Sequence, residues 1–201
     1  MDLYEYKWSR EVIPYIKSGL ERYGVEVYEV TPQDTEGDAS QDNLTRRKNR
    51  IAAKVTQSGK HAVYLSIHGN AAGTGTKWYN ANGWAVYTTK DRSKDAKGQA
   101  EGSNKRNSVT LAQTLFDEAA EILPQYGKTI NRVGELRTAK HWETNDFGAV
   151  NNTFIPTALT ENLFYTNPDD CKFMSSDTGK RVIAQIHING VLKFIKKMNW
   201  A

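Results

Sequence analysis

A histidine and a glutamate stand at the ends of two apolar runs in this chain. His68 follows the run at 62–67 (AVYLSI), and a loop of small residues at 69–73 comes directly after it. Glu161 closes the run at 155–161 (IPTALTE). Both runs are short and apolar, and the first is typical of a strand buried on both faces. Ligands bind open α/β sheets beyond the carboxyl ends of their strands, so an imidazole and a carboxylate there predict a metal site or a general base.

Glu5, near the start of an expected first helix, is a second acidic candidate for the same site. The helix dipole favours a carboxylate at a helix amino terminus, so a purely structural role would explain Glu5 on its own. Glu161 could likewise be an ordinary carboxylate at a strand end. An imidazole and a carboxylate at two strand ends are nevertheless a stronger signal than either residue alone.

The spacing of apolar residues predicts the elements that would position these side chains. Expected helices and strands alternate along the chain, which predicts an α/β fold with a twisted, mostly parallel sheet flanked by helices on both faces. We expect one domain over residues 1–201. The expected helices cover 3–23 (with Pro14 kinking or dividing it), 42–58, 108–123 and 177–198, and the expected strands cover 25–30, 62–68, 83–89, 131–136 and 155–161.

The composition bounds the possible partners. Charged residues make up 25% and the mean hydropathy is −0.67, and no apolar run approaches the roughly 20 residues that a membrane span needs. The formal charge of +4 comes without a basic run interleaved with aromatic residues, so nucleic acid is not an expected partner. Cys171 is the only cysteine, which excludes an intrachain disulfide. We expect a monomer.

Four segments of the chain, taken in order, resemble the type 3 zinc-dependent N-acetylmuramoyl-L-alanine amidases. The early segment LYEYKWSREV looks like the family's segment with a metal-binding glutamate. SIHGNAAG, GWAVYTT and PTALTENLFYTNPDD are similar to the later family motifs. The resemblance covers nearly the whole chain, and the motifs with His68 and Glu161 are fairly specific together.

The resemblance implies an activity and a site. The activity is hydrolysis of the amide between the lactyl group of N-acetylmuramic acid and L-alanine in peptidoglycan, with Zn²⁺ as cofactor. Glu5 and His68 would be metal ligands, and Glu161 would carry a proton from the attacking water to the leaving nitrogen. Asn70 would be a supporting residue. The implied location is the cell envelope, the secreted space or a phage lysin, and the amino terminus of the chain does not indicate a compartment.

Aromatic residues offer a possible contact with the sugar. Trp78 and Tyr79 stand in a polar loop, where we expect them to be exposed and able to stack on substrate. Trp84 lies in an expected strand, and we expect it to be a core residue.

The family's third metal ligand has no counterpart in this sequence. In the family it is a histidine in a Gly-His-Gly-like turn, after a first strand that precedes the glutamate. We expect a late start of the reading frame rather than a degenerate amidase. His141 is the only plausible substitute, and we expect that it does not serve. We therefore expect weak zinc binding and an unpaired edge or a gap in the sheet.

Three other functions stay open at this stage. A metal-free peptidoglycan-binding pseudoenzyme would keep the groove and bind without hydrolysis. A zinc carboxypeptidase would need a ligand pair close together in sequence, and the spacing of His141 and Glu143 does not place them on one helix face. A plain structural α/β domain would explain the periodicity but not the paired strand ends.

Overall fold

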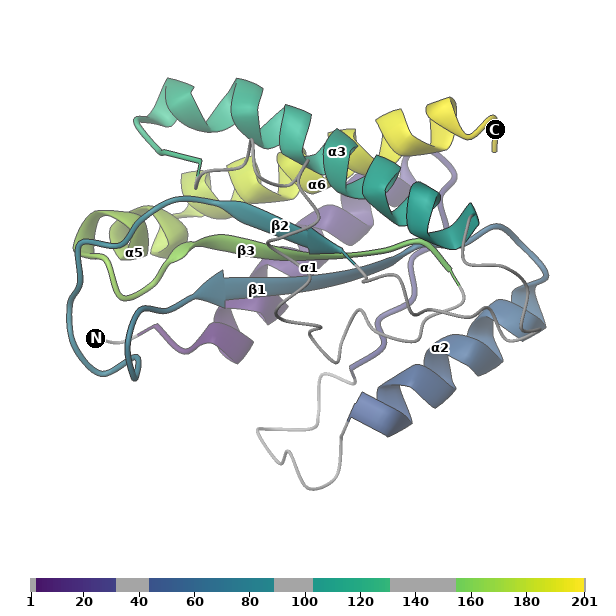
Figure 1. The fold of residues 1–201 in the computed structure, drawn as a ribbon, viewed down its shortest axis with the longest axis horizontal. Coiled ribbons are helices and arrows are strands. Elements are labelled where there is room, and N and C mark those ends of the chain that lie inside the picture. Colours follow the sequence, from purple (N-terminus) through teal and green to yellow (C-terminus); the bar gives the residue numbers. More distant parts are fainter. Residues whose placement is uncertain (1–2, 32–43, 89–102, 131–154, 201) are drawn as a thin grey trace.

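The computed structural model describes residues 3–31, 44–88, 103–130 and 155–200. Both helices and strands form over these residues, as the sequence predicts, but they follow one another in groups rather than in alternation (Figure 1). In chain order they are α1 (Glu5–Glu21), α2 (Leu44–Ser58), β1 (Tyr64–Asn70), β2 (Ala85–Thr88), α3 (Ser103–Ile122), the 3-10 helix η1 (Leu123–Tyr126), β3 (Thr157–Phe164), α5 (Pro168–Ser175) and α6 (Asp177–Lys197). The strand expected at 131–136 lies outside the described residues.

The described sheet has the strand order β1–β3–β2. β1 runs parallel to β3 and places His68 opposite Glu161. β2 runs antiparallel to β3 and places Ala85 opposite Glu161. A parallel return usually needs a helical crossover, whereas the chain passes from β1 to β2 through residues 71–84 without a helix. The α/β class is confirmed, and the described part of the sheet is mixed.

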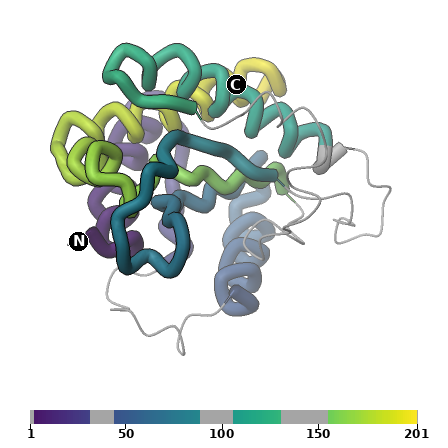
Figure 2. Tube along the Cα trace, turned by 60° about the vertical axis from the view of Figure 1, so that its left-hand side comes forward, coloured from purple at the N-terminus to yellow at the C-terminus, as the bar shows by residue number. Residues whose placement is uncertain are grey.

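The helices gather mainly around α6, which packs against both α1 and α3. α2 lies on the other side of β1 from α3, as both views of the chain show (Figures 1 and 2). α1 buries a stripe of residues at four-residue spacing: Trp8, Val12, Ile16 and Leu20. Pro14 lies within α1 and does not divide it. The Trp8 indole N–H also donates to the carbonyl of Met174 (3.0 Å), which anchors the first turn of α1 near α5.

β1 and β3 differ in burial. Every residue of β3 is buried except Glu161, which is half-buried. In β1 only Ser66 and Gly69 are buried. The expectation that the run at 62–67 is buried on both faces is therefore wrong. The physical reason is that β1 pairs with β3 on one edge, whereas a cavity of about 700 Å³ adjoins residues 60–68.

The segment Val25–Val30 is not a strand, although its alternating sequence predicts one. It follows α1 and lines the same cavity as β1, and no described segment pairs with it in a ladder. A strand needs a neighbour to bond its backbone, and here the neighbouring space is the cavity. Among the described residues, no strand pairs with the edge of β1 that faces the cavity.

Candidate functional site

Glu5 and His68 meet where β1 ends and α1 begins. Nδ1 of His68 lies 2.6 Å from Oε1 of Glu5, and because a carboxylate only accepts, the Nδ1–H donates. Nε2 of His68 lies 2.8 Å from Oγ of Ser66. The side chains of His68 and Glu5 are 34% and 38% exposed, so a ligand can reach them. Ser66 shares a strand face with His68 because the two residues are two positions apart.

The charges around His68 favour a cation. Burial acts to lower the pKa of His68. Glu5 opposes this through its hydrogen bond and its negative charge, and Glu161 opposes it through its charge. Together these carboxylates outweigh burial, so the pKa of His68 is raised. Two carboxylates therefore face one imidazole. Such an arrangement stabilises a positive charge at this point, whether a proton or a metal ion carries it.

Glu161 lies opposite His68 in the ladder between β1 and β3. Its Oε2 atom is buried and has no hydrogen-bond partner among the described residues. Burial, together with the charge of Glu5, raises the pKa of Glu161 to about 7 against the opposing charge of His68. A carboxyl group with a pKa near neutrality can both accept and donate a proton at pH 7.

Asn162 holds the ends of the two strands together. Its Nδ2 donates to the main-chain carbonyl of His68 (2.9 Å) and to Oγ1 of Thr160 (2.9 Å). Its Oδ1 accepts from the indole N–H of Trp84 (2.7 Å), so Trp84 is a core residue as expected. Sequence reasoning missed Asn162. The sequence does contain an indication of its role, because Asn162 is an amide residue directly after Glu161 and before apolar residues.

The backbone changes direction directly after the two site residues. The register between β1 and β3 shifts between His68 and Asn70, and Leu163 has a φ of 67°. The left-handed region is unfavourable for a residue with a Cβ, so the surroundings must hold Leu163 in place. Leu163 is fully buried in the core, and this packing supplies the restraint. The strand ends at His68 and Glu161 are therefore set by a packed, irregular piece of backbone.

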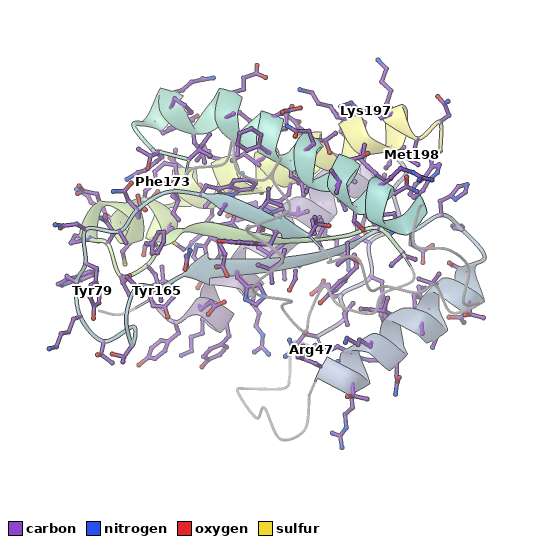
Figure 3. The ribbon with its side chains drawn as sticks, in the orientation of Figure 1. Arg47, Tyr79, Tyr165, Phe173, Lys197 and Met198 are labelled. Carbon is purple, nitrogen blue, oxygen red and sulfur yellow. The ribbon has the colours of Figure 1, made fainter. Side chains whose placement is uncertain are left out.

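Tyr165 is a further residue near the site that sequence reasoning missed. Burial and the charges of Glu5 and Glu161 raise the pKa of its hydroxyl. The ring of Tyr165 lies close to Gly69 and Gly75. A Cβ atom added at Gly69 would lie 3.5 Å from Cδ1 of Tyr165, and one added at Gly75 would lie 3.1 Å from its hydroxyl oxygen. Figure 3 shows its side chain beside the loop that follows β1. The signal was its place in the loop after the strand that carries Glu161.

The three expected substrate-binding residues are placed differently. Asn70 turns toward its own loop, where Oδ1 accepts from the amide of Ala71 (2.8 Å). Trp78 is 51% exposed. Tyr79 is half-buried, and its hydroxyl lies against Gly73, so that a Cβ there would clash with it. None of the contacts described for these three residues joins them to the carboxylates or to the imidazole of the site.

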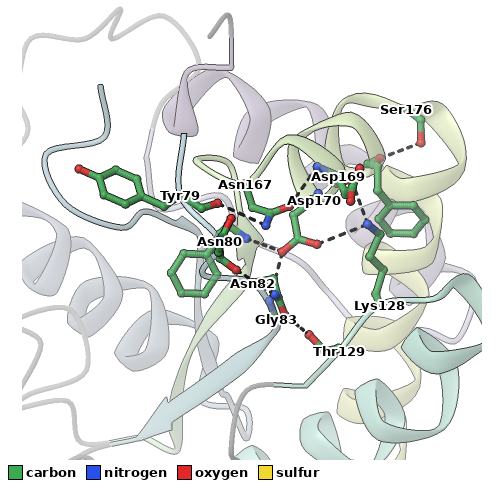
Figure 4. A network of polar contacts seen from close by, with 12 residues as sticks. Tyr79, Asn80, Asn82, Gly83, Lys128, Thr129, Asn167, Asp169, Asp170 and Ser176 are labelled. Atoms are coloured by element: carbon green, nitrogen blue, oxygen red, sulfur yellow. Dashed lines mark hydrogen bonds and ion pairs between the residues drawn. The ribbon is translucent and has the colours of Figure 1, made fainter. Parts of the chain in front are cut away.

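A polar network fastens the loop that carries Trp78 and Tyr79 (Figure 4). Asp170 in α5 is buried, and its Oδ2 accepts from the amides of Gly83 and Phe164 at 3.1 Å each. Nζ of Lys128 lies 3.4 Å from Oδ1 of the same carboxylate. The loop is therefore tied to α5 at its far end.

The remaining histidines do not complete a metal site. His61 stacks on Trp200, with ring centroids 4.6 Å apart. His187 is fully buried, and its Nε2 lies 2.8 Å from Oγ1 of Thr160. His141 lies outside the described residues. Among the residues that the structure describes, no group of three or more His, Cys, Asp or Glu side chains could hold a metal ion.

The residues present fit a partial zinc site. A nitrogen and an oxygen donor, at His68 and Glu5, are in direct contact. The unpartnered oxygen of Glu161 belongs to the residue opposite His68. Catalytic zinc takes three protein ligands and an open position, so these two ligands are one short.

No helix in the described part of the chain is long and apolar enough to cross a membrane.

The fold and the site together define an α/β domain with two carboxylates near a histidine at the ends of two sheet strands. The family model for N-acetylmuramoyl-L-alanine amidase matches residues 1–193. The chain therefore belongs to this family of peptidoglycan amidases, as its motifs indicate, and it has the enzyme activity of the family.

Solved structures show the same fold at low sequence identity. The catalytic domain of the amidase CwlV from Bacillus (Paenibacillus) polymyxa var. colistinus is 19% identical, with a TM-score of 0.64, and the match covers 100% of this chain and 88% of that one. Ami1 from Mycobacterium smegmatis is 17% identical, with a TM-score of 0.66, over 96% of this chain and 77% of that one. CwlD from Clostridioides difficile, solved in complex with the GerS lipoprotein, is 16% identical, with a TM-score of 0.61, over 98% and 88%. No curated protein matches the chain.

Proposed function

We propose that this chain hydrolyses the amide between N-acetylmuramic acid and L-alanine with Glu161 as the proton carrier and with zinc held at Glu5 and His68. The observation that carries this proposal is the state of Glu161. Its carboxyl group is half-buried opposite His68, one oxygen has no described partner, and its pKa is about 7. A structural carboxylate would be expected to pair both oxygens.

The roles of the side chains follow from their contacts. A zinc ion bound at Glu5 and His68 would supply a water of lowered pKa and would polarise the scissile carbonyl. The oxygen of the attacking water bonds to the carbonyl carbon, Glu161 takes a proton from this water at its unpartnered oxygen, and it gives the proton to the L-alanine nitrogen as the C–N bond breaks. Ser66 orients the imidazole through Nε2, and Asn162 holds the main chain of His68 against β3.

The loop beyond β1 supplies the sugar-binding side of the proposed site. The exposed indole of Trp78 stacks on a sugar ring, Tyr79 borders the same surface, and Asn70 supports the turn after His68. We further propose that the chain acts as a monomer on peptidoglycan, in the cell envelope, as a secreted enzyme or as a phage lysin. The catalytic domain of the CD27L endolysin has a TM-score of 0.52 to this chain, which accords with the last setting.

A muropeptide assay tests the reaction. The chain, with added Zn²⁺, should release a peptide with a free L-alanine amino group, which mass spectrometry detects. Glu161→Gln should lower the rate by about 10²- to 10⁴-fold, the usual contribution of a general acid–base. Glu121→Gln, an exposed carboxylate of α3, is the matched control and should leave the rate unchanged. Binding of muropeptide without hydrolysis, at any zinc concentration, would instead identify a pseudoenzyme.

Zinc titration tests the ligands separately from the reaction. We expect weak binding, because two ligands are present among the described residues where catalytic zinc takes three. His68→Ala and Glu5→Gln should each abolish the remaining affinity, whereas His61→Ala should not change it, because His61 stacks on Trp200. Stoichiometric, tightly held zinc in the 201-residue chain would contradict a two-ligand site.

A further inference from the structure

A chain of buried polar side chains runs behind Glu161, on the opposite face of β3. Thr160 and Asn162 flank Glu161, and because side chains alternate along a strand, they point away from its carboxyl group. Oγ1 of Thr160 lies 2.8 Å from Nε2 of His187 in α6 and 2.9 Å from Nδ2 of Asn162. The same Nδ2 donates to the main-chain carbonyl of His68 (2.9 Å). His187 is therefore joined to the main chain of His68 through two side chains of β3.

The contacts of His187 determine which of its ring nitrogens carries the proton. Nδ1 lies 2.7 Å from the main-chain carbonyl of Ile183, and a carbonyl only accepts, so the proton is on Nδ1. Burial lowers the pKa of His187 to about 4, so the ring is neutral at pH 7 and Nε2 is an acceptor. The hydroxyl of Thr160 therefore donates to Nε2, and its oxygen accepts from Asn162.

The amide of Asn162 is oriented from two sides. The indole N–H of Trp84 can only donate, so the amide atom 2.7 Å from it is the acceptor Oδ1. Nδ2 consequently faces two oxygen atoms, Oγ1 of Thr160 and the carbonyl of His68. An amide with its oxygen and nitrogen exchanged would place donor against donor and acceptor against acceptor. We refer to these fully buried side chains as the buried network: Trp84, Thr160, Asn162 and His187.

The buried network ties together the elements that carry the site. It links α6 to β3, to the end of β1 at His68 and to Trp84, which directly precedes β2. The backbone of β3 becomes irregular directly beyond the network, at Leu163 with its φ of 67°. An unmatched polar group is costly when it is buried, so a fully matched network favours a single arrangement of these strand ends.

We propose that His187 is a positioning residue for the amidase reaction: its imidazole fixes Thr160 and Asn162, which hold Glu161 and the main chain of His68 at the separation that the reaction needs. This role rests on the proposed function, because Glu161 and His68 act there. A misplacement of about 1 Å in an active site can cost about 10²-fold in rate. Since His187 acts from behind β3, loss of the network should lower kcat and leave KM nearly unchanged.

The protonated nitrogen of His187 tests the network without any need for activity. A long-range ¹H–¹⁵N correlation spectrum of the wild-type chain at pH 7 should show a proton on Nδ1 and none on Nε2, and His187→Gln assigns the signals. Thr160→Val should shift the indole N–H signal of Trp84, because Asn162 loses its hydroxyl partner. A ring with its proton on Nε2, or with both nitrogens protonated, would overturn the proposal.

Two pairs of variants test the effect on the reaction. Thr160→Val removes the hydroxyl and His187→Leu removes the acceptor, and each should lower kcat for muropeptide about tenfold or more, with KM within about twofold. Thr160→Ser keeps the hydroxyl, and the side-chain oxygen of His187→Gln can accept in place of Nε2, so both should restore kcat to within about threefold of wild type. Thr88→Val is the matched control, because Thr88 is a buried hydroxyl of β2 that donates to the carbonyl of Thr157 (2.9 Å) outside the network.

The outcomes separate the positioning role from the proposed function. Circular dichroism confirms that each variant folds, and either Thr160→Val or His187→Leu suffices if the other does not fold. In an active wild-type chain, a fall in kcat for Thr160→Val no larger than that for Thr88→Val or Thr160→Ser would overturn the positioning role alone. A wild-type chain that does not hydrolyse muropeptide would overturn the proposed function, and the positioning role with it.

Discussion

β1 and β3 both deliver a functional side chain to the same sheet edge, but they do so from different environments. β3 lies between two strands and is buried along its length, apart from Glu161. Among the described strands β1 has one neighbour, β3, and its other edge faces the cavity that residues 25–31 and 60–68 line. Burial raises the pKa of Glu161 to about 7, which suits proton transfer. Partial exposure leaves His68 open to a ligand. The packed environment of β3 raises the pKa of Glu161, and the open environment of β1 leaves the imidazole of His68 accessible.

The largest expected difference between the two strands is in stability. Leu159 in β3 is 2% exposed, whereas Leu65 in β1 is half-buried and lines the cavity beside this strand. Leu159→Ala should lower the free energy of unfolding by about 2–5 kcal/mol, the usual cost of a buried leucine, and Leu65→Ala by roughly 1 kcal/mol. Urea denaturation measures both. Equal losses would mean that β1 is as well packed as β3.

The same comparison explains what the sequence could predict. Apolar spacing located α1, α2, α3, α6 and the three described strands, because local burial patterns determine them. It missed α5, since the short segment Pro168–Ser175 begins with a cap, Asn167, and polar residues typical of a loop. It also predicted a strand at Val25–Val30 that does not form. The alternation of apolar and acidic residues there fits a strand, but it does not indicate whether a neighbouring strand exists to pair with it.

The candidate site was predictable in part for a similar reason. Glu5 and His68 were matched to the family motif, and the structure joins them at 2.6 Å. Ser66, Asn162 and Tyr165 were missed, since their importance depends on which side chains face one another across strands. Such contacts arise from register and from the irregular backbone at Leu163, which no local pattern encodes.

Two histidines extend the comparison to pH. Burial lowers the pKa of His187, beneath β3, to about 4. The unfolded value is near 6.5, so the unfolded chain takes up this proton first as the pH falls. Stability should therefore decrease between pH 6.5 and about 4, by up to about 3 kcal/mol.

The measurement is urea denaturation across this pH range, together with NMR titration of the imidazole signals. His187→Gln should flatten the decrease. His68, whose pKa is raised by the two carboxylates, should become protonated at a higher pH than His187. If His68 and His187 titrate at the same pH, the two imidazoles do not have the different environments that the comparison requires.

A smaller effect of opposite sign is expected at Glu161. Its pKa is raised in the folded chain, so its contribution to stability is present below the unfolded value near 4.3 and is lost as the pH rises through about 7. Glu161→Gln should therefore raise stability at pH 8 by about 1–3 kcal/mol and change it little at pH 4. Glu121→Gln, at an exposed position of α3, is the control for removing a charge. A loss of stability at pH 8 would show that the carboxylate is favourably paired.

The smallest expected effect lies on the exposed rim beyond β1. Trp78→Ala should raise the KM for muropeptide about three- to tenfold with little change in kcat, because stacking of an aromatic ring contributes about 0.5–1.5 kcal/mol to binding. Tyr23→Ala removes an aromatic ring that is 68% exposed near the far end of α1, and it should leave KM unchanged. Steady-state kinetics distinguishes the two. A fall in kcat at constant KM would place Trp78 in the reaction itself, so that the open side of the site would contribute chemistry as well as binding.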